Sequence, residues 1–315
     1  MSKNIKPILL VAGDPKSIFL EIFFKSLRKK KYKNPLILIV NKKILINQIK
    51  TLKYKFKLNQ LIINQINYKN IDNKKINFID VEFNNKSINK YIFESFEIAL
   101  HLIKKNNNVS LINGPINKKK ILNQKFLGIT EYLDFKSKSK GKSVMLIFNK
   151  TLSVSPLTTH VPLKKVHSYI NKIKIINHVK TIDEFYKKRF KIKPIIGITG
   201  LNPHCESNFL DSEEDKIISP AIEFLKRKKY KVTGPYSGDT IFLKNNYKKF
   251  NVIIGMYHDQ VLAPIKSIFG FNAINVTLGL PFIRISPDHG PNYEMFLKNK
   301  SNPNSLIEAI KFLDN

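Results

Sequence analysis

A chain of 315 residues with 43% hydrophobic content is long enough to form two domains with buried cores. Its single cysteine, Cys205, excludes an internal disulfide, and no apolar run reaches the length that crosses a membrane. The formal net charge of +32 arises from 55 basic and 23 acidic residues, but only four of the basic residues are arginine.

The excess of lysine is spread along the chain, whereas nucleic-acid-binding proteins usually cluster their charge and hold phosphate with arginine. We therefore interpret it as a solvated surface whose field attracts anionic substrates, and we expect no nucleic-acid partner. The amino-terminal residues lead directly into an apolar run without a signal-peptide pattern, and the single cysteine fits a reducing compartment. We expect a cytoplasmic protein with no membrane partner.

The first part of the chain alternates strand and helix patterns. The apolar run Ile8–Ala12 is followed by the turn residues 13–15 and then by a helical pattern. Ser87 is placed to cap a long amphipathic helix that extends to Ile103. Further strands are expected at Pro35–Val40, Leu61–Ile66, Ile76–Val81 and Val109–Ile112. This repeated order predicts an α/β protein with a largely parallel sheet.

The later part of the chain begins with two strands that we expect to pair antiparallel, Ser143–Phe148 and Leu152–Val154. Short apolar runs bounded by turn residues predict further strands, and longer amphipathic patterns predict helices. The expected strands are Pro194–Thr199, Val232–Asp239 (strand or loop), Val252–Met256 and Ile274–Leu278. The expected helices are Leu163–Phe190, Ser212–Lys228 and Asn304–Leu313.

Three of the seven histidines directly follow predicted strands: His160, His204 and His258. Open α/β sheets place their sites at the carboxyl ends of strands, so these imidazoles have the chance to converge. Three imidazoles with an open position are typical of a catalytic zinc site, although other divalent ions are possible. The long spacing leaves ordinary packed histidines open as the alternative. The remaining histidines in helical patterns, His101, His167 and His178, are interpreted as surface or packing residues.

Eight segments between Val11 and Gly290 resemble the 4-hydroxythreonine-4-phosphate dehydrogenase family, in the same order. They read VAGDP, NGPINK, GITEYL, TTHVPLKKV, GLNPH, GPYSGDTIF, YHDQVLAPIK and NVTLGLPFIRISPDHG. The resemblance implies an isopropylmalate-dehydrogenase-like two-domain α/β/α fold with a mixed, mainly parallel sheet. It implies a first domain of residues 1–128 plus 288–315. The second, residues 129–287, would carry most metal and substrate residues and the dimer interface of a homodimer with a shared active site.

The same resemblance implies an enzyme of pyridoxal phosphate biosynthesis. The family oxidises 4-(phosphooxy)-L-threonine with NAD or NADP, and the 3-oxo acid loses carbon dioxide to give 3-amino-2-oxopropyl phosphate. A divalent metal (zinc, magnesium or cobalt) can hold the substrate hydroxyl and lower its pKa. The family's metal ligands fall on His160, His204 and His258. Its substrate contacts fall on Thr130, Lys266, Asn275 and Arg284, and on the position that Ile129 occupies here.

The residue types fit that chemistry. Lys266 and Arg284 supply positive charge for a phosphate or carboxylate group, and arginine offers a bidentate fork. Lys266 is also a candidate catalytic residue, together with Asp239 and Asp259, which could orient a metal-binding imidazole. Either aspartate could equally be a loop cap. The expected edge of the cofactor site is the turn formed by Asp288, His289 and Gly290. No GxGxxG sequence occurs, so a Rossmann fingerprint is excluded.

The chain departs from the family pattern at several positions. The first turn, GDPKSIFLE, lacks two glycines and a proline, the loop after His204 is not glycine-rich, and PNYEMFLKNK follows Gly290 where small residues are usual. Ile129 replaces a substrate-binding histidine, which predicts weaker substrate binding that Ile129→His would improve. The alternative is that Ile129 packs into the core, where a histidine would be an unsatisfied polar group and would destabilise the protein. Two alternatives therefore stay open: a dehydrogenase of the same scaffold acting on another phosphorylated or hydroxylated acid, and a basic RNA-binding protein that is not an enzyme.

Overall fold

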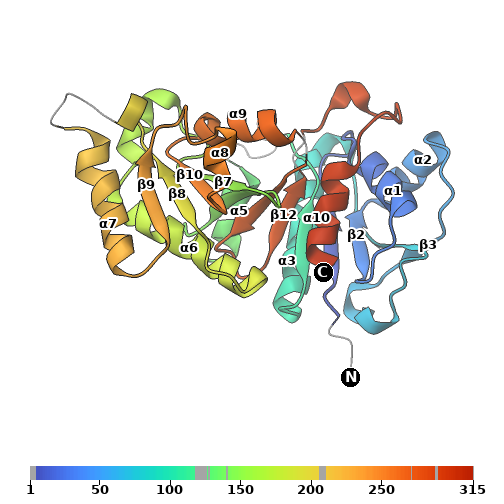
Figure 1. Cartoon of the computed structure of the whole chain (residues 1–315). Coiled ribbons are helices and arrows are strands. Elements are labelled where there is room, and N and C mark those ends of the chain that lie inside the picture. Colours follow the sequence, from blue (N-terminus) through green and yellow to red (C-terminus); the bar gives the residue numbers. More distant parts are fainter. Residues whose placement is uncertain are drawn as a thin grey trace. The chain divides into compact units, whose positions relative to one another are not determined.

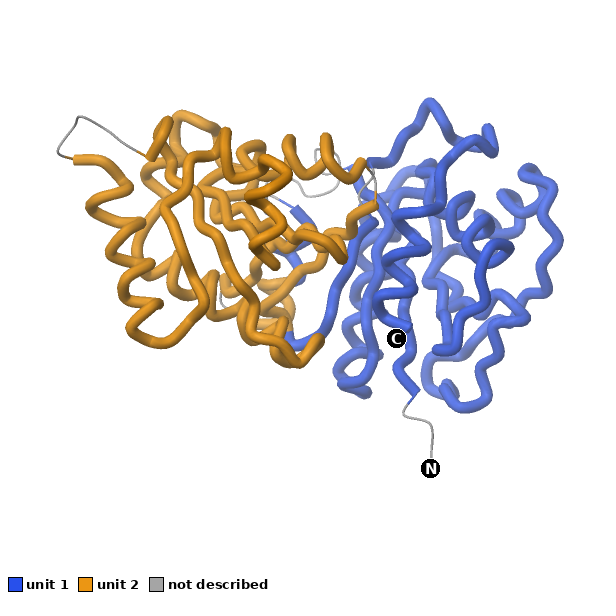
Figure 2. Tube along the Cα trace, in the orientation of Figure 1, with its two compact units in different colours: residues 1–133, 281–315 blue, residues 134–280 orange. Residues whose placement is uncertain are grey.

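The computed structural model describes residues 5–117, 126, 128–139, 141–205, 211–270, 272–287 and 290–314. The chain forms two compact units, which Figure 2 shows in different colours. Unit 1 comprises Met1–Leu133 and Pro281–Asn315, and unit 2 comprises Asp134–Leu280. The boundaries expected from the sequence, after residues 128 and 287, lie nearby. The observed boundaries nevertheless assign Thr130 and Arg284 to unit 1, because the strand that begins at Arg284 pairs with a unit 1 strand.

Unit 1 is built on a parallel sheet with the strand order β3-β4-β2-β1-β5-β12. Its strands are β1 (Ile8–Val11), β2 (Leu36–Val40), β3 (Leu58–Gln60), β4 (Ile76–Asp80), β5 (Ser110–Asn113) and β12 (Arg284–Pro287). Every residue of β1 and β2 is buried. That burial explains their unbroken apolar sequences, because helices cover both faces of a parallel sheet.

Within the described residues, the helices of unit 1 are α1 (Phe19–Lys29), α2 (Lys42–Thr51), α3 (Ile88–Lys105) and α10 (Asn304–Asp314), and α5 (Ile129–Lys136) continues into unit 2. The Asn41 side chain caps α2 by accepting a hydrogen bond from the Ile44 backbone. The predicted cap of α3 is wrong, because the Ser87 side chain makes no cap hydrogen bond. Asn84 instead caps the 3₁₀ turn Asn85–Ser87, which leads into the helix.

The strand predicted at Leu61–Ile66 is also wrong. The strand in this region is β3, three residues that end at Gln60, and Ile63–Gln65 forms a 3₁₀ turn. The Leu61 amide still donates to the Phe78 carbonyl, and then the Gln65 amide closes back onto the Ile62 carbonyl. The apolar run therefore turns away from the sheet edge where the ladder ends.

Unit 2 contains a mixed sheet with the strand order β11-β6-β7-β10-β8-β9. Its strands are β6 (Val144–Phe148), β7 (Ser153–Pro156), β8 (Ile196–Thr199), β9 (Val232–Tyr236), β10 (Val252–Gly255) and β11 (Ile274–Leu278). Strand β6 is antiparallel to β7 and to β11, whereas β7, β10, β8 and β9 are mutually parallel. The predicted antiparallel pair and the mixed, mainly parallel α/β class are confirmed.

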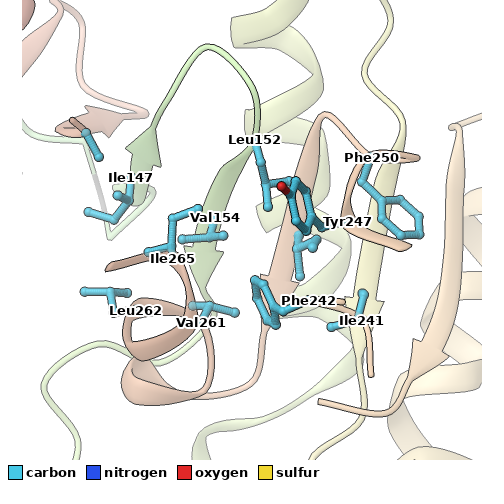
Figure 3. Close-up of a cluster of buried hydrophobic side chains, with 12 residues drawn as sticks. Ile147, Leu152, Val154, Ile241, Phe242, Tyr247, Phe250, Val261, Leu262 and Ile265 are labelled. Atoms are coloured by element: carbon cyan, nitrogen blue, oxygen red, sulfur yellow. The ribbon is translucent and has the colours of Figure 1, made fainter. Parts of the chain in front are cut away.

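The α-helices of unit 2 in the described part of the chain are α6 (Lys172–Phe190), α7 (Ser219–Arg227), α8 (Lys244–Tyr247) and α9 (His258–Phe269). Figure 3 shows how Val261, Leu262 and Ile265 of α9 join a buried cluster with Leu152 and Val154 of the β7 region. This packing fixes the start of α9 against the sheet. In the parts of the chain that the structure describes, no helix is both long and apolar enough to span a bilayer.

Candidate functional site

The three strand-end histidines of unit 2 follow neighbouring strands. Strand β10 lies between β7 and β8 (Figure 1), so the segments that carry His160, His258 and His204 leave the same edge of the sheet. The ring centroids of His160 and His258 are 6.3 Å apart. His204 is exposed and has a positive φ of 57°, at the end of the loop that follows β8. The topology thus brings the three segments that carry these imidazoles to one edge of the sheet.

Three imidazoles on segments that follow adjacent strands are a donor set that suits a divalent transition metal. Among the described residues, however, no three histidine, cysteine, aspartate or glutamate side chains stand close enough together to hold a metal ion. The donor chemistry of the three imidazoles therefore fits a metal, but the three side chains do not converge on one point in this structure.

The two candidate aspartates lie beside these histidines. An oxygen of Asp259 is 2.7 Å from Nδ1 of His258, a contact that can hold the ring and direct Nε2 outward. Asp239 accepts a hydrogen bond from the Ser237 hydroxyl. That hydrogen bond, and to a smaller extent the nearby His204, lowers the pKa of Asp239. Both carboxyl groups are exposed, so each acts in a solvated environment.

Arg284, a predicted substrate residue, lies in unit 1 in a polar cluster of its own. Its side chain is 3% exposed, and its Nε donates to Oδ1 of Asn113 at 2.7 Å. One terminal nitrogen donates to the Thr130 hydroxyl at 3.2 Å. Burial lowers the pKa of Arg284 to about 10, partly opposed by Glu131, so the guanidinium stays charged at neutral pH. A buried, oriented guanidinium of this kind is suited to phosphate or carboxylate.

Asn113 is a further candidate for the site, which the sequence analysis did not select. It ends β5, is 3% exposed, and its side-chain nitrogen donates to the Gly114 carbonyl, which turns its oxygen toward Arg284. The sequence contains a pattern that could have identified it, because Asn113 is a polar residue at the carboxyl end of a buried strand. Its partner lies 171 residues away, so the pairing itself is invisible in the sequence.

The remaining predicted substrate residues differ in their surroundings. Ile129 is 6% exposed and packs in the interior at the start of α5. Asn275 lies on β11, and within the described residues its buried side-chain oxygen has no hydrogen-bond partner. A buried oxygen of this kind is suited to a donor group on a ligand. Lys266 is exposed on α9. Gly290 is exposed, whereas Asp288 and His289 lie outside the described residues.

Two departures from the family pattern meet in unit 1. Gly13, with φ +76°, approaches the loop after β5 so closely that an added Cβ would lie 2.5 Å from the Pro115 carbonyl oxygen. The next residue, Asp14, is buried and accepts a hydrogen bond of 2.6 Å from the Tyr293 hydroxyl. Tyr293 belongs to the segment that replaces the usual small residues, so this bulky segment contacts the altered first turn.

Comparison with known proteins gives a consistent result. The family model described as pyridoxal phosphate biosynthetic protein PdxA matches residues 31–313. The 4-hydroxythreonine-4-phosphate dehydrogenase of Sulfurihydrogenibium sp. (strain YO3AOP1) is 38% identical over 318 residues, covering 96% of each chain. The crystal structure of the Klebsiella pneumoniae 4-hydroxythreonine-4-phosphate dehydrogenase has a TM-score of 0.83 at 25% identity and covers 98% of each chain.

A more distant structure shares the fold alone. Isocitrate dehydrogenase from Methylococcus capsulatus has a TM-score of 0.52 at 10% identity, covering 96% of this chain and 83% of that one. This likeness agrees with the expected two-domain α/β architecture.

Proposed function

The chain belongs to the family of the pyridoxal phosphate biosynthetic protein PdxA and is an oxidoreductase, and from this premise we propose that it oxidises 4-(phosphooxy)-L-threonine with NAD or NADP. The hydride leaves the carbon that bears the hydroxyl, and the hydroxyl loses its proton, to give a 3-oxo acid. This acid loses carbon dioxide and forms 3-amino-2-oxopropyl phosphate, a precursor of pyridoxal phosphate. The nicotinamide accepts the two electrons as hydride.

The observation that carries the proposal is that the segments bearing the three imidazoles follow the adjacent strands β7, β10 and β8. A divalent cation held by His160, His204 and His258 would supply a Lewis acid at the substrate hydroxyl. Asp259 holds the ring of His258. Asp239 adds negative charge beside His204. These two carboxylates are our candidates for orienting the imidazoles.

Arg284 and Lys266 are our candidates for binding the anionic groups of the substrate. The Arg284 guanidinium is fixed by Asn113 and Thr130, so it needs little reorganisation to bind a phosphate or carboxylate. Lys266 contributes a positive charge from α9, and Asn275 contributes a buried amide oxygen that can accept a hydrogen bond. Gly290, together with Asp288 and His289, is our candidate for the edge of the nicotinamide cofactor site.

The direct test is reduction of NAD or NADP by the purified protein with 4-(phosphooxy)-L-threonine, before and after treatment with a chelator. We expect activity that the chelator removes and that added zinc, magnesium or cobalt restores. His160→Ala, His204→Ala and His258→Ala should each lower kcat by orders of magnitude, whereas His167→Ala, on an exposed turn, should have little effect. Equal and mild effects in all four variants would contradict the metal assignment.

Ile129 favours a second candidate function: oxidation of a different phosphorylated or hydroxylated acid on the same scaffold. The family's histidine is replaced here by an apolar side chain that is 6% exposed. The substrate contact from this position is therefore lost. A panel of hydroxy acids with and without phosphate would decide, because a higher kcat/KM for another acid would select the alternative. Membership of an enzyme family argues against the non-enzymatic RNA-binding alternative.

A further inference from the structure

Gln260 joins the ends of the two strands that lead to His204 and His258. The backbone register between β8 and β10 extends as far as Ile198 and Ile254. Beyond that point the Gln260 side chain connects the two segments. Its oxygen accepts hydrogen bonds from the Met256 amide at 2.7 Å and from the Thr199 hydroxyl at 2.9 Å, and its nitrogen donates to the Gly200 carbonyl at 2.8 Å.

Glu214 also holds this loop by hydrogen bonds. This carboxylate is 2% exposed and accepts hydrogen bonds from the backbone amides of Leu201 at 2.6 Å and Asn202 at 2.8 Å. Its second oxygen accepts from the Asn202 side chain at 2.8 Å. The backbone at the start of the loop that leads to His204 is therefore held by hydrogen bonds from both Glu214 and Gln260.

The surroundings of Gln260 leave its amide little freedom. A Cβ added at Gly255 would lie 3.0 Å from the Gln260 oxygen and 2.5 Å from a methyl group of Val261. A Cβ added at Gly238 would lie 3.4 Å from the Gln260 nitrogen. The amide thus lies between two glycines, and its three hydrogen bonds use both its donor and its acceptor ends. Neither a carboxylate nor an apolar side chain of equal length can reproduce them.

We propose that Gln260 is a positioning residue that sets the spacing between the His204 loop and the His258 turn, and so prepares the site for a divalent cation. The inference rests on the metal dependence proposed above. Gln260 itself lies two positions after His258 at the start of α9, whose apolar face is anchored in the buried cluster of Figure 3. The helix therefore provides a rigid base from which the amide holds the neighbouring loop.

The test measures Co²⁺ binding to the whole, metal-stripped protein by calorimetric titration, without substrate or turnover. Gln260→Met keeps the length of the side chain and removes all three hydrogen bonds. We expect it to weaken Co²⁺ binding about 10–100-fold, the usual effect of losing a group that supports metal ligands. Thr199→Val removes only the hydroxyl that contacts the Gln260 oxygen, so the backbone contacts remain and the loss should be smaller, below about tenfold.

Asn73 provides a matched control in unit 1. Its side-chain oxygen accepts from the Leu36 amide at 2.9 Å, and its nitrogen donates to the Tyr32 and Asn34 carbonyls, so it joins backbone segments as Gln260 does. Asn73→Leu should lower the melting temperature but leave Co²⁺ affinity unchanged. Equal affinity losses in Asn73→Leu and Gln260→Met would overturn the inference, because they would reflect general destabilisation.

The outcomes separate the inference from the proposed function. Absence of Co²⁺ binding in the unaltered protein would contradict the proposed metal dependence itself. Normal binding in the unaltered protein together with unchanged affinity in Thr199→Val and Gln260→Met would refute the role of Gln260 alone. If Gln260→Met does not fold, Thr199→Val decides, because its isosteric side chain keeps the packing of the buried strand end.

Discussion

At the scale of the residue, the hydrogen bonds of Arg284 depend on the planar shape of its guanidinium group. Its guanidinium contacts Asn113 through Nε and Thr130 through a terminal nitrogen. A lysine ammonium is a point charge that cannot reproduce this planar fork. Arg284→Lys should therefore raise KM for the phosphorylated substrate roughly ten- to a hundredfold, the equivalent of one charge-assisted hydrogen bond. The matched control is Arg227→Lys on the exposed end of α7, and normal kinetics in Arg284→Lys would remove Arg284 from the site.

The burial of Ile129 changes the expected effect of restoring the family's histidine at this position. The sequence pattern alone predicted that Ile129→His would improve substrate binding, but the side chain is 6% exposed. Burying an imidazole without a partner costs roughly 1–3 kcal/mol. We therefore expect Ile129→His to lower the melting temperature without lowering KM. A melting curve and steady-state kinetics check this together, and an unchanged melting temperature with lower KM would restore the earlier expectation.

At the scale of the element, α6 carries a buried histidine that links the stability of unit 2 to pH. His178 is 6% exposed, and its Nε2 lies 2.6 Å from the Ser155 hydroxyl on β7. Burial, reinforced by Lys174, lowers the pKa of His178 from its ordinary value of 6.5 to about 3. Below pH 6.5 the unfolded chain binds a proton at this residue before the folded protein does. Stability is therefore fully present above pH 6.5 and is lost as the pH falls toward 3.

The expected loss is roughly 1.4 kcal/mol per pH unit in this window, if His178 acts alone. Urea unfolding between pH 7.5 and pH 5 measures the slope. His178→Gln should remove it, although the variant starts from a lower stability because the Ser155 contact changes. His167→Gln, on an exposed turn, should leave the slope intact. An identical slope in both variants would show that other groups dominate the pH dependence.

At the scale of the whole molecule, we expect a homodimer with a shared active site, as proposed from the family resemblance. Light scattering at micromolar protein should give twice the chain mass. Activity per chain should fall on dilution below the dissociation constant, because each site would need residues from both copies. A monomer that retains full activity at nanomolar concentration would contradict the prediction.

The pattern of apolar and turn residues in the sequence was enough to predict most strands and the histidines that follow three of them. Short β-branched runs bounded by turn residues predicted β10 and β11 within one residue of their ends. The positions of His160, His204 and His258 after strands followed from the same runs, because a parallel sheet carries its strand ends to one edge. These features depend on neighbours in the sequence, so the sequence reveals them.

Other features depended on contacts between distant residues. The helix α9 begins directly at His258 and contains Pro264, so no separate start signal marked it, and its packing against the β7 region stabilises it. Strand β12 was not predicted, because Arg284–Pro287 becomes a strand by pairing with residues far away in the sequence, such as those of β5. The Arg284–Asn113 and Gln260–Gly200 contacts join segments 171 and 60 residues apart. Such pairings arise from packing of the whole chain, so only the tertiary structure decided which polar groups meet.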